Sequence, residues 1–155
     1  MKKKLWLVAA CLLPVRGAEP AQPMFWSAKQ LAGIDQSALS KLNPERHLGT
    51  ERLLDAAFVA FRNGSGEAEL HQNSADLILV RSGSGAVRVG GKMTEGRTTA
   101  PGEMRGKSVE GDTKYPISAG DMLYIPPNTV HQFWMETGQS FTALVVKLAP
   151  AAASR

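Results

Sequence analysis

Cysteine is nearly absent from this chain of 155 residues. The only one is Cys11, close to the N-terminus. If residues 1–17 are removed, as we expect below, the remaining chain contains neither a thiol nucleophile nor a disulfide. Its hydrophobic core must then be stable without covalent cross-links.

Long apolar runs are also absent. The longest, Leu5 to Val15, falls short of the roughly 18 residues that cross a bilayer. Three lysines precede it and Gly17 follows, which is the pattern of a secretory signal. We expect residues 1–17 to be a signal peptide, and the protein to be periplasmic or secreted without a membrane contact after cleavage. A lipoprotein signal ending at Cys11, or a buried N-terminal helix or strand, is the alternative.

An excess of charge is the third absence. The chain has 18 basic and 14 acidic residues, a net charge of +4, but residues 1–17 contain four of the basic residues and no acidic one. The remainder therefore has a net charge of zero. A neutral chain lacks the basic surface of nucleic-acid-binding proteins, so nucleic acid is excluded as a partner.

Residues 18–45 are expected to form an N-terminal extension with one short helix. Apolar residues recur at helical spacing from Ser27 to Leu42, Ser27 is a suitable cap, and Asn43-Pro44 ends the pattern. Glycine and proline are frequent in the chain, at 15 and 9 residues. This frequency favours a turn-rich β architecture after the helix.

Residues 46–149 show short β-like runs separated by turns, and residues 150–155 are expected to be a frayed end. The predicted strands are 58–62, 67–71, 77–81, 86–89, 122–125, 131–135 and 141–148. Residues 82–85 are predicted to form a hairpin turn. The polar segment 92–113 is predicted to be a long loop, either a lid over a cavity or a solvated surface loop. Such strand spacing is typical of an antiparallel sandwich or barrel.

Two stretches have a distinctive residue spacing. In the second, Gly120 is followed by five residues, Pro126, one residue, Asn128, two residues and His131. In the first, His71 is followed by Asn73 and Asp76, then by six residues and Gly83. A glycine turn, an apolar strand and a Pro-Pro-Asn turn would place His131 at the head of a strand that faces the barrel interior.

Together the two stretches resemble the paired motifs of the cupin family. The second motif matches at every fixed position. In the first, Asn73 stands where the family has a second histidine, Asp76 replaces a glutamate, and the intervening turn is one residue shorter. The resemblance covers about residues 55–148. It implies an all-β fold, a double-stranded β-helix or jelly-roll cupin barrel with a short N-terminal helix, from a small exported bacterial protein.

The resemblance also implies a divalent metal, often iron, manganese, nickel or zinc, held by His71, Asn73, Asp76 and His131. Two imidazoles and a carboxylate suit a transition metal, whereas the amide oxygen of Asn73 is a poor ligand for soft metals. Glu69 shares a strand face with His71 and is a second candidate for the acidic ligand, or for orienting an imidazole.

Each candidate also has a purely structural interpretation. His71 would be a half-exposed strand residue, residues 73–76 an Asx-type turn, and His131 a rim residue stacked on aromatic side chains. His47 is expected to be exposed. Tyr124 and Trp134 are expected either to line the barrel wall or to pack in the core.

Three hypotheses of function follow. The first is a metal-dependent enzyme that acts on a small polar organic molecule. The second is a non-catalytic small-molecule-binding barrel without metal, which the loss of a histidine at Asn73 favours. The third is a homodimer formed through an edge strand such as 58–62. The sequence has no Ser-His-Asp order and no phosphate loop, so enzymatic activity is left open.

Overall fold

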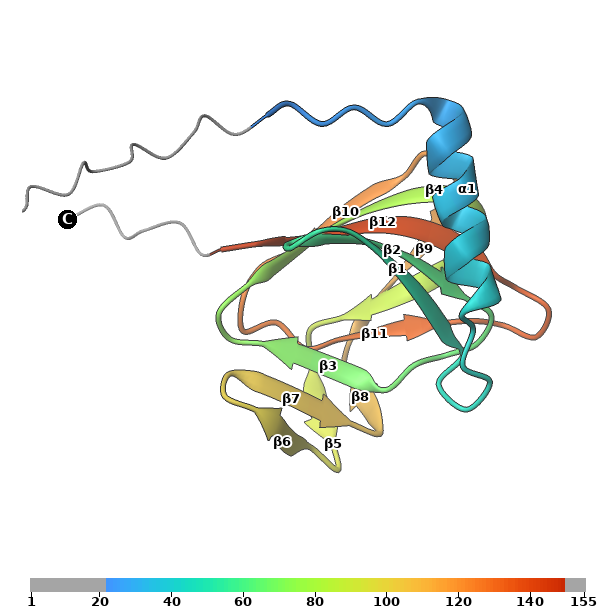
Figure 1. Cartoon of the computed structure of the whole chain (residues 1–155). Helices are drawn as coiled ribbons and strands as arrows, with labels where there is room; N and C mark the ends of the chain where they lie inside the picture. Colours follow the sequence, from blue (N-terminus) through green and yellow to red (C-terminus); the bar gives the residue numbers. More distant parts are fainter. Residues whose placement is uncertain (1–21, 150–155) are drawn as a thin grey trace, which may run out of the picture.

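The computed structural model describes residues 22–149 (Figure 1). The expected signal peptide at 1–17 and the expected frayed end at 150–155 lie outside these residues. Within the described part, no helix is long and apolar enough to cross a membrane.

A single helix, α1 (Ala28–Ser40), precedes the strands in the described chain. The Ser27 hydroxyl accepts a hydrogen bond from the backbone N–H of Gln30, and the Gln30 side chain accepts one from the Ser27 backbone, which is a capping box. The helix packs against the first two strands (Figure 1). Asp35 joins it to the barrel through two hydrogen bonds from Arg81, at 2.8 and 2.9 Å. The predicted helix is therefore confirmed, with Ser27 as its cap, and it ends two residues before the predicted Leu42.

Twelve strands follow the helix, and all of their pairings are antiparallel. They are β1 (Leu48–Leu54), β2 (Ala57–Arg62), β3 (Ala68–His71), β4 (Ala75–Val89), β5 (Lys92–Thr94), β6 (Arg97–Ala100), β7 (Glu103–Gly106), β8 (Ser108–Glu110), β9 (Thr113–Ser118), β10 (Met122–Ile125), β11 (His131–Trp134) and β12 (Phe141–Leu148). The main sheet has the order β1-β2-β12-β4-β11-β3-β7-β6, while β9 and β10 also pair with β4.

The long strand β4 connects the two layers of the barrel. Its first half pairs with β12 and β10, and its second half pairs with β11 and β9. The predicted hairpin turn at 82–85 is wrong, because the strand bends there and continues. Gly83 has a φ of 76°, and a Cβ at this position would collide with the Ser140 carbonyl on the neighbouring chain segment. The glycines therefore bend one strand where the sequence pattern suggested two strands.

The predicted loop at 92–113 is also wrong, because this segment forms the four short strands β5 to β8. Strand β7 pairs with β3 and so extends the sheet beside the first motif, while β5 and β8 form a separate pair (Figure 1). Most side chains of these strands are exposed or half-buried. Without a fully buried face the apolar alternation that identifies a strand is missing.

The hydrophobic core lies between the layers of the curled sheet. Its largest fully buried members include Ile78, Val87, Ile125 and Phe141. The architecture is the expected all-β jelly-roll barrel with one short N-terminal helix.

Candidate metal centre

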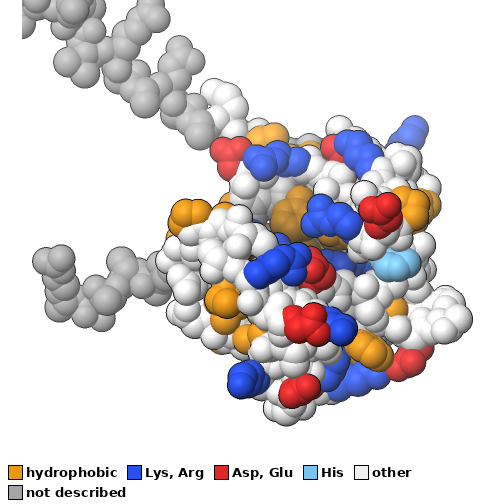
Figure 2. Space-filling model, turned by 90° about the horizontal axis from the view of Figure 1, so that it is seen from below, with side chains coloured by type: hydrophobic (Ala, Val, Ile, Leu, Met, Phe, Trp, Pro, Cys, Tyr) orange, Lys and Arg blue, Asp and Glu red, His pale blue; other side chains and the backbone are white. Residues whose placement is uncertain are grey.

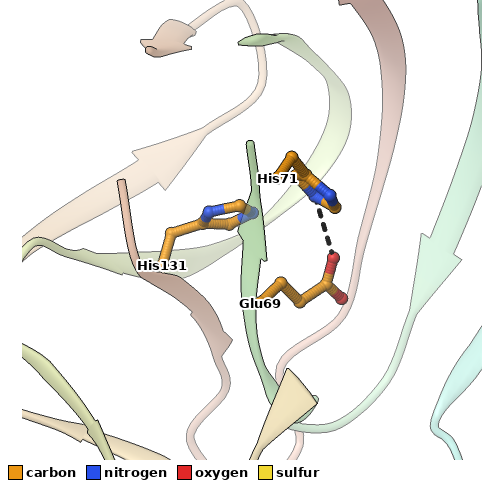
Figure 3. A group of neighbouring side chains, drawn as sticks. All are labelled: Glu69, His71 and His131. Carbon is orange, nitrogen blue, oxygen red and sulfur yellow. Dashed lines mark ion pairs between the residues drawn. The ribbon is translucent and has the colours of Figure 1, made fainter. Parts of the chain in front are cut away.

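The site lies where β3, the start of β4 and the start of β11 meet. Glu69 and His71 share one face of β3 by strand alternation. His131 begins β11 directly opposite Glu69 in the strand register. Figure 3 shows the three side chains converging, and one potential ligand atom from each lies within 4.8 Å of the others. Asp76, the second residue of β4, joins them, because its Oδ2 is 3.6 Å from the Nε2 of both histidines.

The second motif is built as its spacing predicts. Gly120 and Asn128 both have positive φ, 96° and 60°, which marks the two turns on either side of β10. The backbone N–H of Asn128 donates to the carbonyl of His71 at 2.8 Å. This bond ties the turn before His131 to the end of β3, and so fixes the distance between the two motifs.

Both imidazoles are oriented through their Nδ1 atoms. His71 donates from Nδ1 to the Glu103 carboxylate at 2.6 Å, and His131 donates from Nδ1 to the Thr129 carbonyl at 3.1 Å. Each ring therefore presents Nε2 to the centre. Within residues 22–149, the Nε2 of His131 is the one fully buried side-chain nitrogen or oxygen without a hydrogen-bond partner. An unpartnered buried lone pair that faces carboxylates is suited to bind a cation.

The charge states of His131 and Glu69 also suit metal ligation. Burial lowers the pKa of His131, so its imidazole is neutral at neutral pH. Burial alone would raise the pKa of Glu69, but the contact with His71, 3.5 Å from its Oε2, and the positive charges of Arg62 and Arg105 outweigh it and leave that pKa well below its usual range. An ionised carboxylate and a neutral imidazole are the forms that bind a metal.

Lys147 is part of the site, and the sequence analysis missed it. Its Nζ donates to Oδ1 of Asp76 at 2.6 Å and to Nε2 of His71 at 2.8 Å. Along β12, Phe141, Ala143 and Val145 are buried, so strand alternation places residue 147 on the same inward face. This alternation could have identified Lys147 from the sequence, because a lysine that continues the buried face of a strand needs a partner for its charge.

The structure brings together three of the four residues predicted to bind metal. His71, Asp76 and His131 meet, whereas Asn73 is exposed and its side chain lies beside Gly102. Glu69 joins these three residues instead, and His71 then stands at the second histidine position of the motif, where Asn73 was predicted. With Glu69 at the first histidine position, the first motif reads Glu69, one residue, His71, four residues, Asp76, six residues and Gly83. No shortened turn is then needed, so the predicted alignment was displaced by two residues.

The other side chains considered from the sequence lie away from the centre. His47 is exposed, as expected. Tyr124 is 55% exposed and does not line the barrel interior. Trp134 is half-buried and packs against the Arg88 guanidinium, 5.2 Å from its ring centroid.

A cavity of about 300 Å³ adjoins the centre. One part of its wall is apolar, and the other part carries charged and polar side chains. The apolar residues are Leu48, Phe58, Ala60, Phe133, Phe141 and Val145; the polar residues are Arg46, Thr50, Arg62, Glu69, His71, Ser74, Asp76, Glu103, Arg105 and Lys147. Figure 2 shows a recess with hydrophobic side chains inside it and basic and acidic side chains around it. This is the composition of a small-molecule site.

The residues of the centre fit a divalent transition metal. Two imidazoles and two carboxylates are a suitable donor set for iron, manganese, nickel or zinc. The buried Nε2 of His131 lacks a partner that a metal would supply. Lys147 opposes this fit, because its ammonium already engages Asp76 and His71.

Comparison with known proteins gives the same fold. The family model of the AraC-like ligand binding domain matches residues 105–155, which include His131 and Lys147. CapF, solved with the inhibitor 3-isopropenyl-tropolone, is 12% identical with a TM-score of 0.50, over 72% of this chain and 30% of its own length. No curated protein sequence matches the chain.

Two shorter solved proteins are similar over most of their length. A predicted oxalate decarboxylase from Thermotoga maritima is 17% identical, with a TM-score of 0.48, over 66% of this chain and 81% of its own. A cupin protein from Bacteroides fragilis is 17% identical, with a TM-score of 0.42, over 66% of this chain and 73% of its own.

Proposed function

We propose that this chain, a small single-domain barrel of the cupin type, binds a divalent transition metal beside a cavity for a small polar organic ligand. The metal ligands would be Glu69, His71, Asp76 and His131. The observation that carries the proposal is the buried, unpartnered Nε2 of His131, which faces three other potential ligands.

The chain's own residues prepare this centre in two ways. Glu103 and the Thr129 carbonyl hold the protons of the two Nδ1 atoms, so that both Nε2 lone pairs point inward. Burial of His131 and Asp76, which are 1% and 3% exposed, excludes bulk water from the ligand atoms. A bound divalent metal supplies Lewis-acid polarisation of a ligand oxygen.

A second function is favoured by Lys147. Its ammonium already engages Asp76 and His71, so the polar end of the cavity is satisfied in part without a metal. On this alternative the chain is a non-catalytic barrel that binds a small molecule, and its histidines are polar groups of the pocket. For either function we propose export to the periplasm or beyond, supported by residues 1–17.

The deciding experiment is the metal content of the protein purified without chelator, measured together with single variants. We expect nearly one metal per chain in the wild type, and its loss in His71→Ala and His131→Ala. Asn73→Ala is the matched control, because Asn73 lies two residues from His71 but is exposed, and this variant should keep the metal.

Two results would overturn the metal proposal. One is a wild type that binds no metal after reconstitution with iron, manganese, nickel and zinc in turn. The other is a metal that is retained in both histidine variants, which would place it elsewhere. The first result would leave the metal-free ligand-binding barrel as the function.

A further inference from the structure

Two arginines stand where the apolar and the charged parts of the cavity wall meet. Arg62 is the last residue of β2 and Arg105 lies on β7, so they reach the cavity from opposite sides of Glu69. Arg62 approaches Oε1 of Glu69 at 3.4 Å, and Arg105 approaches Oε2 at 3.5 Å. Two guanidinium groups therefore flank a single carboxylate, at distances longer than good hydrogen bonds.

Arg62 is buried, but its N–H donors are poorly satisfied. Its residue is 5% exposed, and its guanidinium carbon lies 4.5 Å from the ring centroid of Phe133. In the described part of the chain, its only side-chain hydrogen bond is the long one to Glu69. None of its nitrogens is both fully buried and unpartnered. Its other N–H groups therefore open onto accessible space, which includes this cavity and a neighbouring one beside Gly66.

Arg105 leaves similar donors available. Within residues 22–149 its side chain makes one hydrogen bond, 3.3 Å to the backbone carbonyl of Met104. Its contact with Glu103 is longer, at 3.8 Å. Planar guanidinium groups with free N–H donors are well suited to bind a carboxylate through two parallel hydrogen bonds.

The cavity also has an excess of positive charge. Four basic side chains line it, Arg46, Arg62, Arg105 and Lys147, against three carboxylates. A divalent metal at the centre would increase this excess. A ligand with a negative charge would reduce it.

We propose that the cavity binds a small organic carboxylate whose charged end lies between Arg62 and Arg105. Its hydrocarbon part packs against Phe58, Phe133 and Phe141 on the apolar wall. The volume of about 300 Å³ is at the lower end for ligand sites, which limits the ligand to a small molecule. The inference rests on the ligand-binding part of the proposed function and holds with or without a metal.

The alternative is that both arginines serve only to stabilise Glu69. Benzoate and benzamide distinguish the two cases, because they have nearly the same shape and differ in charge. We would measure the binding of each to the whole protein by calorimetry, first after treatment with a chelator. The chelator matters because a bound metal would itself attract a carboxylate.

We expect wild type without metal to bind benzoate at least about tenfold more tightly than benzamide, since a hydrogen bond to a charged group is worth that much. Arg105→Gln should lose this preference. Arg52→Gln is the matched control, because Arg52 is exposed on β1 and pairs only with Asp55 among the described residues; it should keep the preference. Arg62→Lys, which retains the charge in a buried position, should weaken benzoate binding without loss of the fold.

Equal binding of the two probes, or binding of neither, would overturn the proposal. So would a preference for benzoate that survives in Arg105→Gln and Arg62→Lys. Metal content of the same samples separates this outcome from failure of the metal centre. A protein that prefers benzoate but binds no metal supports the carboxylate site alone, and a protein that binds metal but shows no preference contradicts it.

Discussion

The two sides of the candidate centre present histidines in opposite surroundings. On the β3 side, His71 lies among charges: Glu103 at Nδ1, Lys147 at Nε2 and Glu69 at 3.5 Å from Nε2. On the β11 side, His131 is hydrogen-bonded among the described residues only to the Thr129 carbonyl, although its Nε2 also lies 3.6 Å from Asp76. Its ring and that of Phe133 meet edge to face, with centroids 6.3 Å apart.

This difference shows which side limits metal binding. A histidine ligand needs a free lone pair on a neutral ring. His131 already has both, because burial keeps it neutral and its Nε2 has no partner in the described chain. His71 has neither freely available, because Lys147 occupies its Nε2 and its carboxylate neighbours favour protonation. The affinity for metal is therefore set on the β3 side.

The largest expected effect comes from removing the lysine that competes there. In Lys147→Met without metal, Asp76 is left as a buried carboxylate with no ammonium partner. We expect the free energy of unfolding to fall by about 3 kcal/mol, the lower end for breaking a buried ion pair, because 28% of the Lys147 side chain is exposed. Metal affinity should rise, because His71 and Asp76 are both released. Urea unfolding with and without metal measures the first effect, and competition with a coloured chelator measures the second.

Two further variants test whether the effect comes from the charge of the side chain at position 147. Lys147→Arg retains the positive charge and should bind metal no more tightly than the wild type. Lys114→Met removes a lysine that pairs with Glu136 on the surface and should change neither quantity. If Lys147→Met bound metal as weakly as the wild type, or more weakly, Lys147 would not be a competitor of the metal.

The sequence predicts the position of the ligand on β11 better than the positions of the ligands on the β3 side. Gly120, Asn128 and His131 lie close together along the chain, in the turns on either side of β10 and at the start of β11, so local turn geometry largely determines where the histidine lies. On the β3 side the same holds for Glu69 and His71, which strand alternation places on one face. Asn73 was assigned to the centre only because the first motif was aligned two residues too late.

The partners that were missed come from strands distant in sequence. Lys147 lies directly opposite Asp76 in the pairing of β12 with β4, and Glu103 lies directly opposite His71 in the pairing of β7 with β3. A one-residue change of register would turn either side chain to the other face of the sheet. Register between distant strands depends on the whole barrel, so the sequence indicates which residues can ligate but not which charges oppose them.

A smaller effect is expected from the residue that orients His71. Glu103→Gln keeps the length of the side chain but removes the charge that accepts the Nδ1 proton. We expect metal affinity to fall about tenfold, the lower end for loss of such an orienting group. Glu110→Gln, an exposed substitution of the same kind on β8, should leave it unchanged. An equal loss in both variants would mean that net charge, and not the orientation of His71, is responsible.

The smallest effects expected are the pH dependences of the two histidines in the metal-free protein, and they have opposite signs. Although burial opposes it, the contact with the Glu69 carboxylate and the other nearby carboxylates raise the pKa of His71 above its ordinary 6.5. Its stabilising contribution is then complete below pH 6.5 and is lost as pH rises through the raised pKa. Burial lowers the pKa of His131 below 6.5, so its contribution is present above pH 6.5 and is lost as pH falls through the lowered pKa.

Urea unfolding of wild type, His71→Gln and His131→Gln over a range of pH, in the presence of chelator, separates these contributions. The difference in unfolding free energy between wild type and His71→Gln should be largest on the acidic side and shrink above pH 6.5. The difference for His131→Gln should be largest above pH 6.5 and shrink below it. Parallel trends in the two variants would show that both imidazoles experience the same surroundings. The β3 side would then not limit metal binding more than the β11 side does.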